Sequence, residues 1–214
     1  YRFGAGLSRS LAVEIPSGLV VLSPPCGVDE SDMDALVAQA SKVGPVVGLV
    51  ATNAFHHLGI LPWKKRFPAA KVYAPVQSMK RLGKKGLSDM QPLSELAGGA
   101  QVEFIDLPHF KTGEVLVVVR GESGPVWYMT DVLMNMPEAP KHWLIGRLFR
   151  WTNSAPGFRF SNMAAMLMVK DKKALKAWLR ERAVSAPPTR MVFAHGPTLE
   201  LSPGAPELLA LLTA

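Results

Sequence analysis

The feature that most constrains the fold is a five-residue apolar run, Val46–Val50. A run without any polar side chain is typical of a strand whose two faces are both covered. The residues before it have the spacing of an amphipathic helix, with Ser31 in the position of a residue that caps its start. The apolar face of this helix is formed by Met33, Leu36, Val37 and Ala40. Together these patterns predict a buried sheet covered by helices.

The rest of the chain alternates further strands with helices. The other predicted strands are Ser8–Ile15, Leu19–Leu22, Lys71–Ala74, Val102–Leu107, Glu114–Arg120, Val126–Met129 and Met191–Ala194. The other predicted helices are Trp63–Arg66, His142–Trp151, Asp171–Arg182 and a terminal helix that opens at Pro206, while Met163–Val169 is ambiguous. Turn-forming residues predict a hairpin for the first two strands and a meander for the three strands between residues 102 and 129. This order predicts a mixed α/β fold with helices on both faces of β-sheet.

Length and composition are those of a globular protein. The chain has 214 residues, of which 48% are hydrophobic, too many for a disordered chain, and we expect a single domain over residues 1–214. No apolar stretch approaches the ~20 residues of a membrane span, which predicts a soluble protein. The single Cys26 has no disulfide partner, which favours a reducing, cytoplasmic compartment. The sequence begins at Tyr1, so a preceding targeting segment stays open.

The net charge of +7 comes from one acid-free segment. Its basic residues are Lys64, Lys65, Arg66, Lys71, Lys80, Arg81, Lys84 and Lys85. A local basic patch favours an anionic partner, whether nucleic acid, lipid headgroups or a charged substrate. A solvated helix face is the simpler interpretation, because ordinary core and turn residues interrupt the segment and no nucleic-acid recognition motif follows it.

Polar side chains collect just after the predicted buried strands. His56 and His57 follow Val46–Val50, Asp131 follows Val126–Met129, and His195 follows the last predicted strand, Met191–Ala194. Functional groups concentrate at the carboxyl ends of strands, and imidazole and carboxylate groups are the ligands that zinc prefers. A hydrogen-bonded structural cluster is the alternative. His109 and His142 have no acidic or histidine neighbour and are expected to be structural or exposed.

The segment Leu49–Gly59 resembles the strand and loop of the metallo-β-lactamase superfamily, whose motif is His-x-His-x-Asp-His followed by an apolar residue and Gly. Leu107–Gly113 resembles the family's Pro-Gly-His-Thr-x-Gly segment, Met129–Asp131 the segment with the bridging Asp, and Phe193–Gly196 the segment with the last His. The resemblance covers residues from about 8 to 200. It implies a four-layer αββα sandwich.

The ligand positions of the family are only partly retained. Thr52, Ala54 and Phe110 stand where the first metal site has histidines, which implies that this site is lost. His57 and His195 stand on histidine positions of the second site, Asp131 on the bridging carboxylate, and His56 on the Asp that orients the attacking water. The pattern is closest to a divergent branch marked by Asn-x-x-His-His.

Two hypotheses follow for the function. In the first, His57, Asp131 and His195, joined by His56, hold one Zn²⁺ or Fe²⁺ for hydrolysis of a small anionic substrate, with His56 and Asp131 as catalytic groups. His56 could accept a proton from water only where it is not itself a ligand. In the second, no metal is bound, and the same side chains form a polar cluster in an inactive ligand- or protein-binding domain. Nucleic-acid processing is disfavoured, because the family members that cleave nucleic acids resemble the two-metal pattern.

For several other residues the sequence favours a structural role. Glu114 could orient a ligand but is expected to be an ordinary strand-end residue. Trp143 and Trp151, and the methionines Met163, Met166 and Met168, are expected to fill the core. A second basic stretch is free of acids from Ala139 to Asp171 and would favour an anionic substrate if it folds over the strand ends. Its basic residues are Lys141, Arg147, Arg150 and Arg159.

Overall fold

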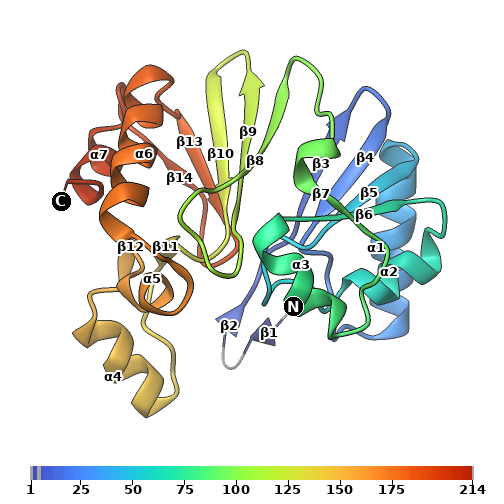
Figure 1. Ribbon diagram of the computed structural model, residues 1–214, viewed down its shortest axis with the longest axis horizontal. Coiled ribbons are helices and arrows are strands. Elements are labelled where there is room, and N and C mark those ends of the chain that lie inside the picture. Colours follow the sequence, from blue (N-terminus) through green and yellow to red (C-terminus); the bar gives the residue numbers. More distant parts are fainter. Residues whose placement is uncertain (1, 4–5, 214) are drawn as a thin grey trace.

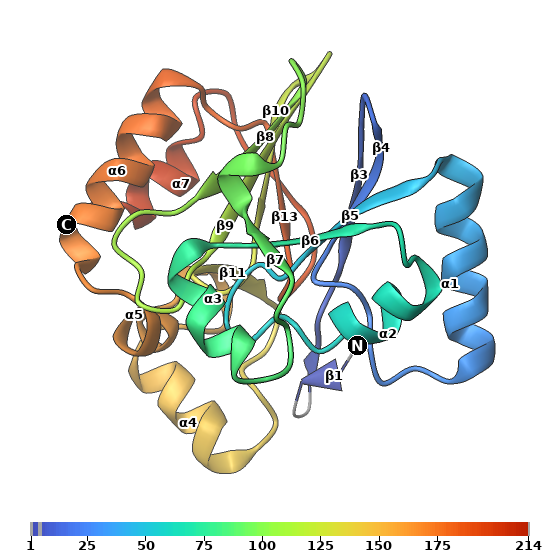
Figure 2. The ribbon, with the colours of Figure 1, turned by 45° about the vertical axis from the view of Figure 1, so that its right-hand side comes forward.

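Two five-stranded sheets lie face to face in the computed structural model, which describes residues 2–3 and 6–213. Helices cover the outer side of each sheet, with α1 and α2 on one side and α6 and α7 on the other (Figure 1; Figure 2). The order of layers is therefore helix, sheet, sheet, helix, which confirms the predicted four-layer αββα sandwich.

The first sheet has the strand order β3-β4-β5-β6-β7. Its strands are β3 (Leu11–Ile15), β4 (Gly18–Leu22), β5 (Val46–Val50), β6 (Lys71–Ala74) and β7 (Met90–Pro92), followed by a short 3₁₀ turn at Leu93–Glu95. The first two strands pair antiparallel as a hairpin, and the others pair parallel. Its helices are α1 (Glu30–Val43), α2 (Ile60–Arg66) and α3 (Val76–Gly83).

The second sheet has the order β14-β13-β10-β9-β8. Its strands are β8 (Val102–Asp106), β9 (Val115–Gly121), β10 (Gly124–Met129), β13 (Arg190–Phe193) and β14 (Leu199–Glu200), and its helices are α6 (Lys172–Ser185) and α7 (Pro206–Leu211). The strands from β8 to β10 form the predicted antiparallel meander, and β10 pairs parallel with β13.

Two smaller ribbons complete the described chain. The first pairs β1 (Arg2–Phe3) with β2 (Gly6–Leu7), and the second pairs β11 (Leu133–Met136) with β12 (Gly157–Phe160), both antiparallel. Helix α4 (Trp143–Trp151) connects the strands of the second ribbon, and α5 (Asn162–Met168) follows it. In both ribbon views α4 lies at one end of the molecule, outside the sandwich (Figure 1; Figure 2).

The central strands β4 and β5 of the first sheet are buried on both faces. In β4, Leu19 and Val21 pack under the helices, whereas Val20 and Leu22 pack against the second sheet. Val46–Val50 behaves in the same way, since Leu49 faces the helices and Val50 the opposite sheet. Successive side chains of a strand point to opposite faces, so only an unbroken apolar run can satisfy both cores. The prediction made from this run is confirmed.

Some sequence predictions need correction. Helix α1 begins at Glu30 with Asp29 before it, so Ser31 lies inside the first turn and does not cap the helix. Helix α3 and the ribbon β11–β12 were not anticipated. Trp143 and Trp151 are 73% and 80% exposed, and Met166 is 60% exposed, so these three side chains do not fill the core. Among the described residues no helix is long and apolar enough to cross a membrane.

Candidate metal centre

Three polar side chains from distant parts of the chain meet at one end of the sheets. His56 Nε2 lies 3.3 Å from Asp131 Oδ1, His195 Nε2 lies 3.1 Å from the same oxygen, and the two nitrogens are 3.2 Å apart. His56 is buried, while Asp131 and His195 each keep 14% of their side-chain surface exposed. The cluster therefore reaches solvent on one side only.

The parallel pairing of β10 with β13 brings Asp131 and His195 together. Met129 and Phe193 are register partners in this pair, and each functional residue lies two positions beyond its partnered strand residue. The chain then turns at Gly196, where φ is +108° and an added Cβ would lie 1.7 Å from the carbonyl oxygen of Asn135. Only glycine fits so close to β11. The His195 backbone oxygen accepts a hydrogen bond from the Asn135 amide at 3.1 Å, which fixes the loop.

Asn53 organises the loop that carries His56. Its side-chain oxygen accepts hydrogen bonds from the backbone amides of Phe55 at 2.8 Å and His56 at 2.9 Å, a turn that asparagine forms readily. Its side-chain nitrogen donates to Asp131 Oδ2 at 2.6 Å and to Glu114 Oε2 at 2.8 Å. All the hydrogen-bonding capacity of this amide is used. Asn53 thus directs the second carboxylate oxygen of Asp131 away from the two histidines.

Glu114 supports the cluster through buried hydrogen bonds to the residues around Asp131. It is completely buried, and its Oε1 accepts hydrogen bonds from the backbone amides of Thr130 at 3.0 Å and Asp131 at 2.7 Å. With the bond from Asn53, each carboxylate oxygen of Glu114 has a donor. Our preference for an ordinary strand-end residue was wrong, because Glu114 fixes both the backbone of Asp131 and the amide that holds its side chain.

The structure separates the two adjacent histidines. His56 turns into the cluster, whereas His57 is half-buried and its Nδ1 lies 3.2 Å from the carbonyl oxygen of Phe55. Among the described residues, the histidine, cysteine and acidic side chains whose ligand atoms converge are His56, Asp131 and His195. His57, which we expected beside Asp131 and His195, is not brought into this group.

The electrostatics of the cluster follow from burial and charge. Burial alone would lower the pKa of His56, but the charge of Asp131 and its hydrogen bond leave that pKa above its usual value. Burial opposes ionisation of Asp131 too, yet the two histidines hold its pKa well below the usual range. Burial, and then the charge of Asp131, raise the pKa of Glu114 to about 7. The pKa of His57 is lowered by burial and by Lys85.

The positions expected for a first metal site lie in the interior. Thr52, Ala54 and Phe110 are all buried, and the hydroxyl of Thr52 lies 2.7 Å from that of Ser23.

The two remaining histidines are exposed, as expected: His109 precedes Phe110, and His142 precedes α4.

The acid-free basic segment contacts the loop that carries His56. Lys85 Nζ donates to the carbonyl oxygen of Ala54 at 3.2 Å, and the guanidinium of Arg81 lies 5.8 Å from the centre of the Phe55 ring. The segment is not uniformly available to a ligand, because Arg66 pairs with Glu30 and Asp34 of α1. Its far end therefore borders the candidate site, while its start helps to hold two helices together.

Two facing sheets between outer helices are the arrangement that the resemblance to metallo-β-lactamases predicted. Comparison with solved structures confirms this fold. A metallo-β-lactamase from Pontibacter korlensis superposes with a TM-score of 0.62 at 14% identity, over 96% of this chain and 86% of the other. The metallo-β-lactamase FIM-1 from Pseudomonas aeruginosa, in its mono-zinc form, gives 0.59 at 14% identity, over 96% and 81%.

A flavoprotein from Thermotoga maritima superposes with a TM-score of 0.62 at 15% identity, over 96% of this chain and 51% of the flavoprotein. The chain thus corresponds to about half of that protein. No family model and no curated protein sequence matches the chain. The chain has the metallo-β-lactamase fold, and its candidate metal-binding residues are His56, Asp131 and His195.

Proposed function

We propose that this protein is a metal-dependent hydrolase in which His56, Asp131 and His195 hold a single divalent ion, Zn²⁺ or Fe²⁺. The observation that carries the proposal is the convergence of two imidazole nitrogens and one carboxylate oxygen, all within 3.3 Å of one another. Two histidines and one carboxylate form a common protein ligand set of catalytic metal sites, which leave a further position open.

The spacing of the three atoms fits an ion. A triangle with sides of 3.1, 3.2 and 3.3 Å has its centre about 1.9 Å from each corner, so an ion just outside its plane would lie at the roughly 2.0–2.2 Å of zinc–ligand bonds. The residual exposure of Asp131 and His195 leaves one side of the triangle open to a substrate.

A single ion is favoured by the surroundings of Asp131. A carboxylate that bridges two ions through both of its oxygens would need Oδ2, but this oxygen accepts a hydrogen bond from Asn53 at 2.6 Å. The three positions that would hold a second ion carry Thr52, Ala54 and Phe110, which are buried and are not metal-binding side chains. Asn53 would therefore act as a positioning residue that keeps Asp131 a ligand through one oxygen.

When bound, such an ion supplies Lewis acidity, which polarises a substrate oxygen and lowers the pKa of water. The side chain of His56 cannot both bind the ion and accept a proton through the same nitrogen, and its Nε2 faces Asp131 and His195. We therefore assign His56 to metal binding. Asp131, with its pKa held low, would stay ionised as a ligand over the physiological range.

The basic residues beside the loop favour a small anionic substrate. Lys85 contacts the backbone of the His56 loop, and Arg81 stacks on Phe55 of the same loop. A cation at the rim of a partly buried site raises the local concentration of anions.

The Lys85→Gln variant tests this preference. For an anionic ester, it should raise KM about tenfold, with little change in KM for a neutral ester. The control is Lys65→Gln on α2.

A metal-free polar cluster in a ligand- or protein-binding domain is the second candidate. The separations that fit an ion are also those of hydrogen bonds, and Asp131 Oδ1 can accept from both histidines. In this case the cluster would stabilise the strand ends and no hydrolysis would follow.

Metal analysis and calorimetric titration of the purified chain separate the two candidates. We expect one equivalent of Zn²⁺ or Fe²⁺, with affinity reduced at least about 100-fold in His195→Ala and His56→Ala. His57→Ala is the matched control, because His57 neighbours His56 in sequence but lies outside the cluster, and it should bind within about threefold of the parent.

The absence of stoichiometric binding by any divalent ion would reject the metal centre in favour of the metal-free cluster. A loss in His57→Ala as large as that in His195→Ala would instead indicate the ligand set that the sequence resemblance implied. Circular dichroism of each variant confirms that a loss of binding is not a loss of fold.

A further inference from the structure

We propose that α4 and α5 form a docking surface for an anionic lipid bilayer. The surface, termed here the α4–α5 face, consists of exposed apolar and basic side chains. These are Trp143, Leu144, Ile145, Trp151, Met166 and Leu167, with Lys141, Arg147, Arg150, Lys170 and Lys172. The proposal is independent of the metal centre.

The apolar part is concentrated in a few residues. Half of the large hydrophobic side chains that are exposed in the described chain belong to α4 and α5, although these helices contribute only 9 and 7 residues. On α4, Trp143, Arg147 and Trp151 follow one another at intervals of four, and Leu144 lies beside them. One side of the helix therefore presents two indoles and a leucine with a guanidinium between them.

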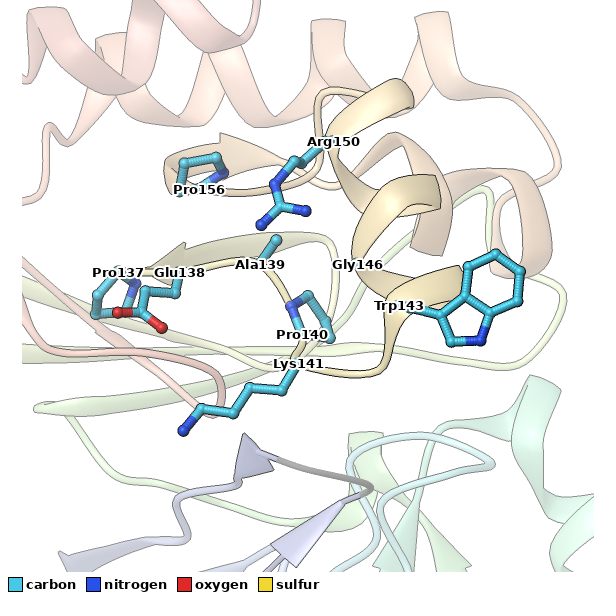
Figure 3. Close-up of a pocket in the computed structure, with 9 residues that line it drawn as sticks. All are labelled: Pro137, Glu138, Ala139, Pro140, Lys141, Trp143, Gly146, Arg150 and Pro156. Carbon is cyan, nitrogen blue, oxygen red and sulfur yellow. The ribbon is translucent and has the colours of Figure 1, made fainter.

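The inward side of α4 explains why these residues point outward. Phe149, on the side away from the two tryptophans, packs against the core next to the second sheet. Gly146, at the edge of the tryptophan side, is buried, and a Cβ added there would lie 2.3 Å from the carbonyl oxygen of Pro140 in the connection to β11. Figure 3 shows the guanidinium of Arg150 pointing into a hollow of about 370 Å³, while the indole of Trp143 lies at its outer end. The tryptophans are consequently left without a covering element of the chain.

The two helices form one continuous surface. A second hollow, of about 450 Å³, is lined by Trp151 of α4, by Met166 of α5, and by Lys170 and Lys172 beyond them. Its lining combines apolar and cationic side chains. This arrangement suits acyl chains below and phosphate groups above, because basic side chains extend their charge outward while their stems cover apolar surface.

The charge of the surface selects the partner. No acidic residue occurs between Ala139 and Lys170; Glu138 and Asp171 flank this stretch, and none of the five cations forms an ion pair within the described residues. A second copy of the chain would place these cations against each other, which is repulsive. An anionic bilayer complements them, and tryptophan with basic residues on a short helix is typical of helices that lie in the interface.

Vesicle co-sedimentation of the full chain tests the proposal. We expect binding to vesicles of phosphatidylcholine mixed with phosphatidylglycerol, weakening with salt, and little binding to phosphatidylcholine alone.

Variants of the α4–α5 face separate the charged from the apolar contribution. Lys141→Gln with Arg147→Gln should weaken binding about 25-fold, or about fivefold for each charge. Trp143→Ser with Trp151→Ser should weaken it at least about tenfold. The matched control, Lys42→Gln with Val43→Ser at the exposed end of α1, should change it less than about twofold.

Absence of binding to the anionic vesicles would overturn the proposal, as would binding that both α4 pairs of substitutions leave unchanged. Sedimentation velocity of the same proteins addresses a second copy as the occupant. If the parent dimerises without vesicles and the tryptophan variant does not, and neither binds lipid, the α4–α5 face is a dimer interface.

Discussion

The candidate metal centre and the α4–α5 face depart from the usual distribution of residues in opposite directions. In the first, charged and polar side chains are buried; in the second, two tryptophans and four other large apolar side chains are exposed. The buried groups Asn53 and Glu114 have partners for their side-chain nitrogen and oxygen atoms. The exposed apolar side chains have no covering element, and the cations beside them form no ion pair within the described residues.

The difference shows that the polar groups of the candidate metal centre are satisfied within the chain, whereas the apolar side chains of the α4–α5 face are not covered by it. A buried polar network is stable only when its members satisfy one another, so removal of one member leaves the others unpaired. An exposed apolar face costs the folded chain little and gains stability only from something outside. Substitutions in the centre should therefore act on folding, whereas those on α4 should act on association.

The largest effect should follow Glu114→Ala. This change removes the acceptor of two buried backbone amides and of the Asn53 side chain, and we expect it to lower the free energy of unfolding by about 3–5 kcal/mol. Urea denaturation followed by circular dichroism measures the loss. Glu122→Ala, at an exposed turn, is the control and should be nearly neutral. A loss below about 1 kcal/mol would show that the network is not a major contributor to stability.

Asn53→Ala should have the next largest effect, about 2–3 kcal/mol. Its amide makes four contacts, but Thr130 and Asp131 would keep their bonds to Glu114. Metal affinity should fall about tenfold as well, because Asp131 would lose the group that orients it. Asn135→Ala serves for comparison, since the side-chain nitrogen of Asn135 makes a single bond, to the carbonyl oxygen of Pro197. Equal losses in the two variants would argue against a special role for Asn53.

Much of the fold could be predicted from local pattern. The run Val46–Val50 has the same bounds as β5, because a short strand that is buried on both faces is apolar at every position. Helix α3 was missed because part of what holds it is distant in sequence: the amide of Val76 donates to Asp106 Oδ2 at 3.2 Å, across 30 residues. The ribbon β11–β12 was missed for a similar reason, since its strands pair across α4.

The candidate site was predictable in its residue types but not in its grouping. His56, Asp131 and His195 follow strands, which the sequence reveals. The choice between His56 and His57 depends on the turn that Asn53 forms, and the role of Glu114 depends on a contact across 61 residues. An asparagine just after a buried strand, with two loop amides following, was the available signal for this turn. Trp143 and Trp151 were misassigned because a periodic pattern does not say which side of a helix is covered.

The contribution of Asp106 to the free energy of unfolding should be smaller and should depend on pH. Burial raises the pKa of this carboxyl to about 6, against an ordinary value of 3.8. The folded state thus keeps the proton to higher pH than the unfolded state, so this group stabilises the fold most below pH ~4, and that stability is lost as pH rises through ~6. Asp106→Asn can retain the bond from Val76 and should remove this decline, worth about 1 kcal/mol after screening by solvent. An unchanged difference between unfolding free energies at pH 4 and pH 7 would contradict the assignment.

The smallest effect on folding should come from the α4–α5 face, although its apolar side chains are the largest exposed ones. Trp143 and Trp151 are 73% and 80% exposed, so Trp143→Ser with Trp151→Ser removes little buried surface. The free energy of unfolding should change by less than about 0.5 kcal/mol, and metal binding should not change. Urea denaturation measures the free energy of unfolding in buffer and its change when anionic vesicles are added. The vesicles should stabilise the parent and not the variant. A loss above about 2 kcal/mol in buffer alone would mean that the tryptophans are part of the core of the folded chain, and that the outward face of α4 needs no external partner.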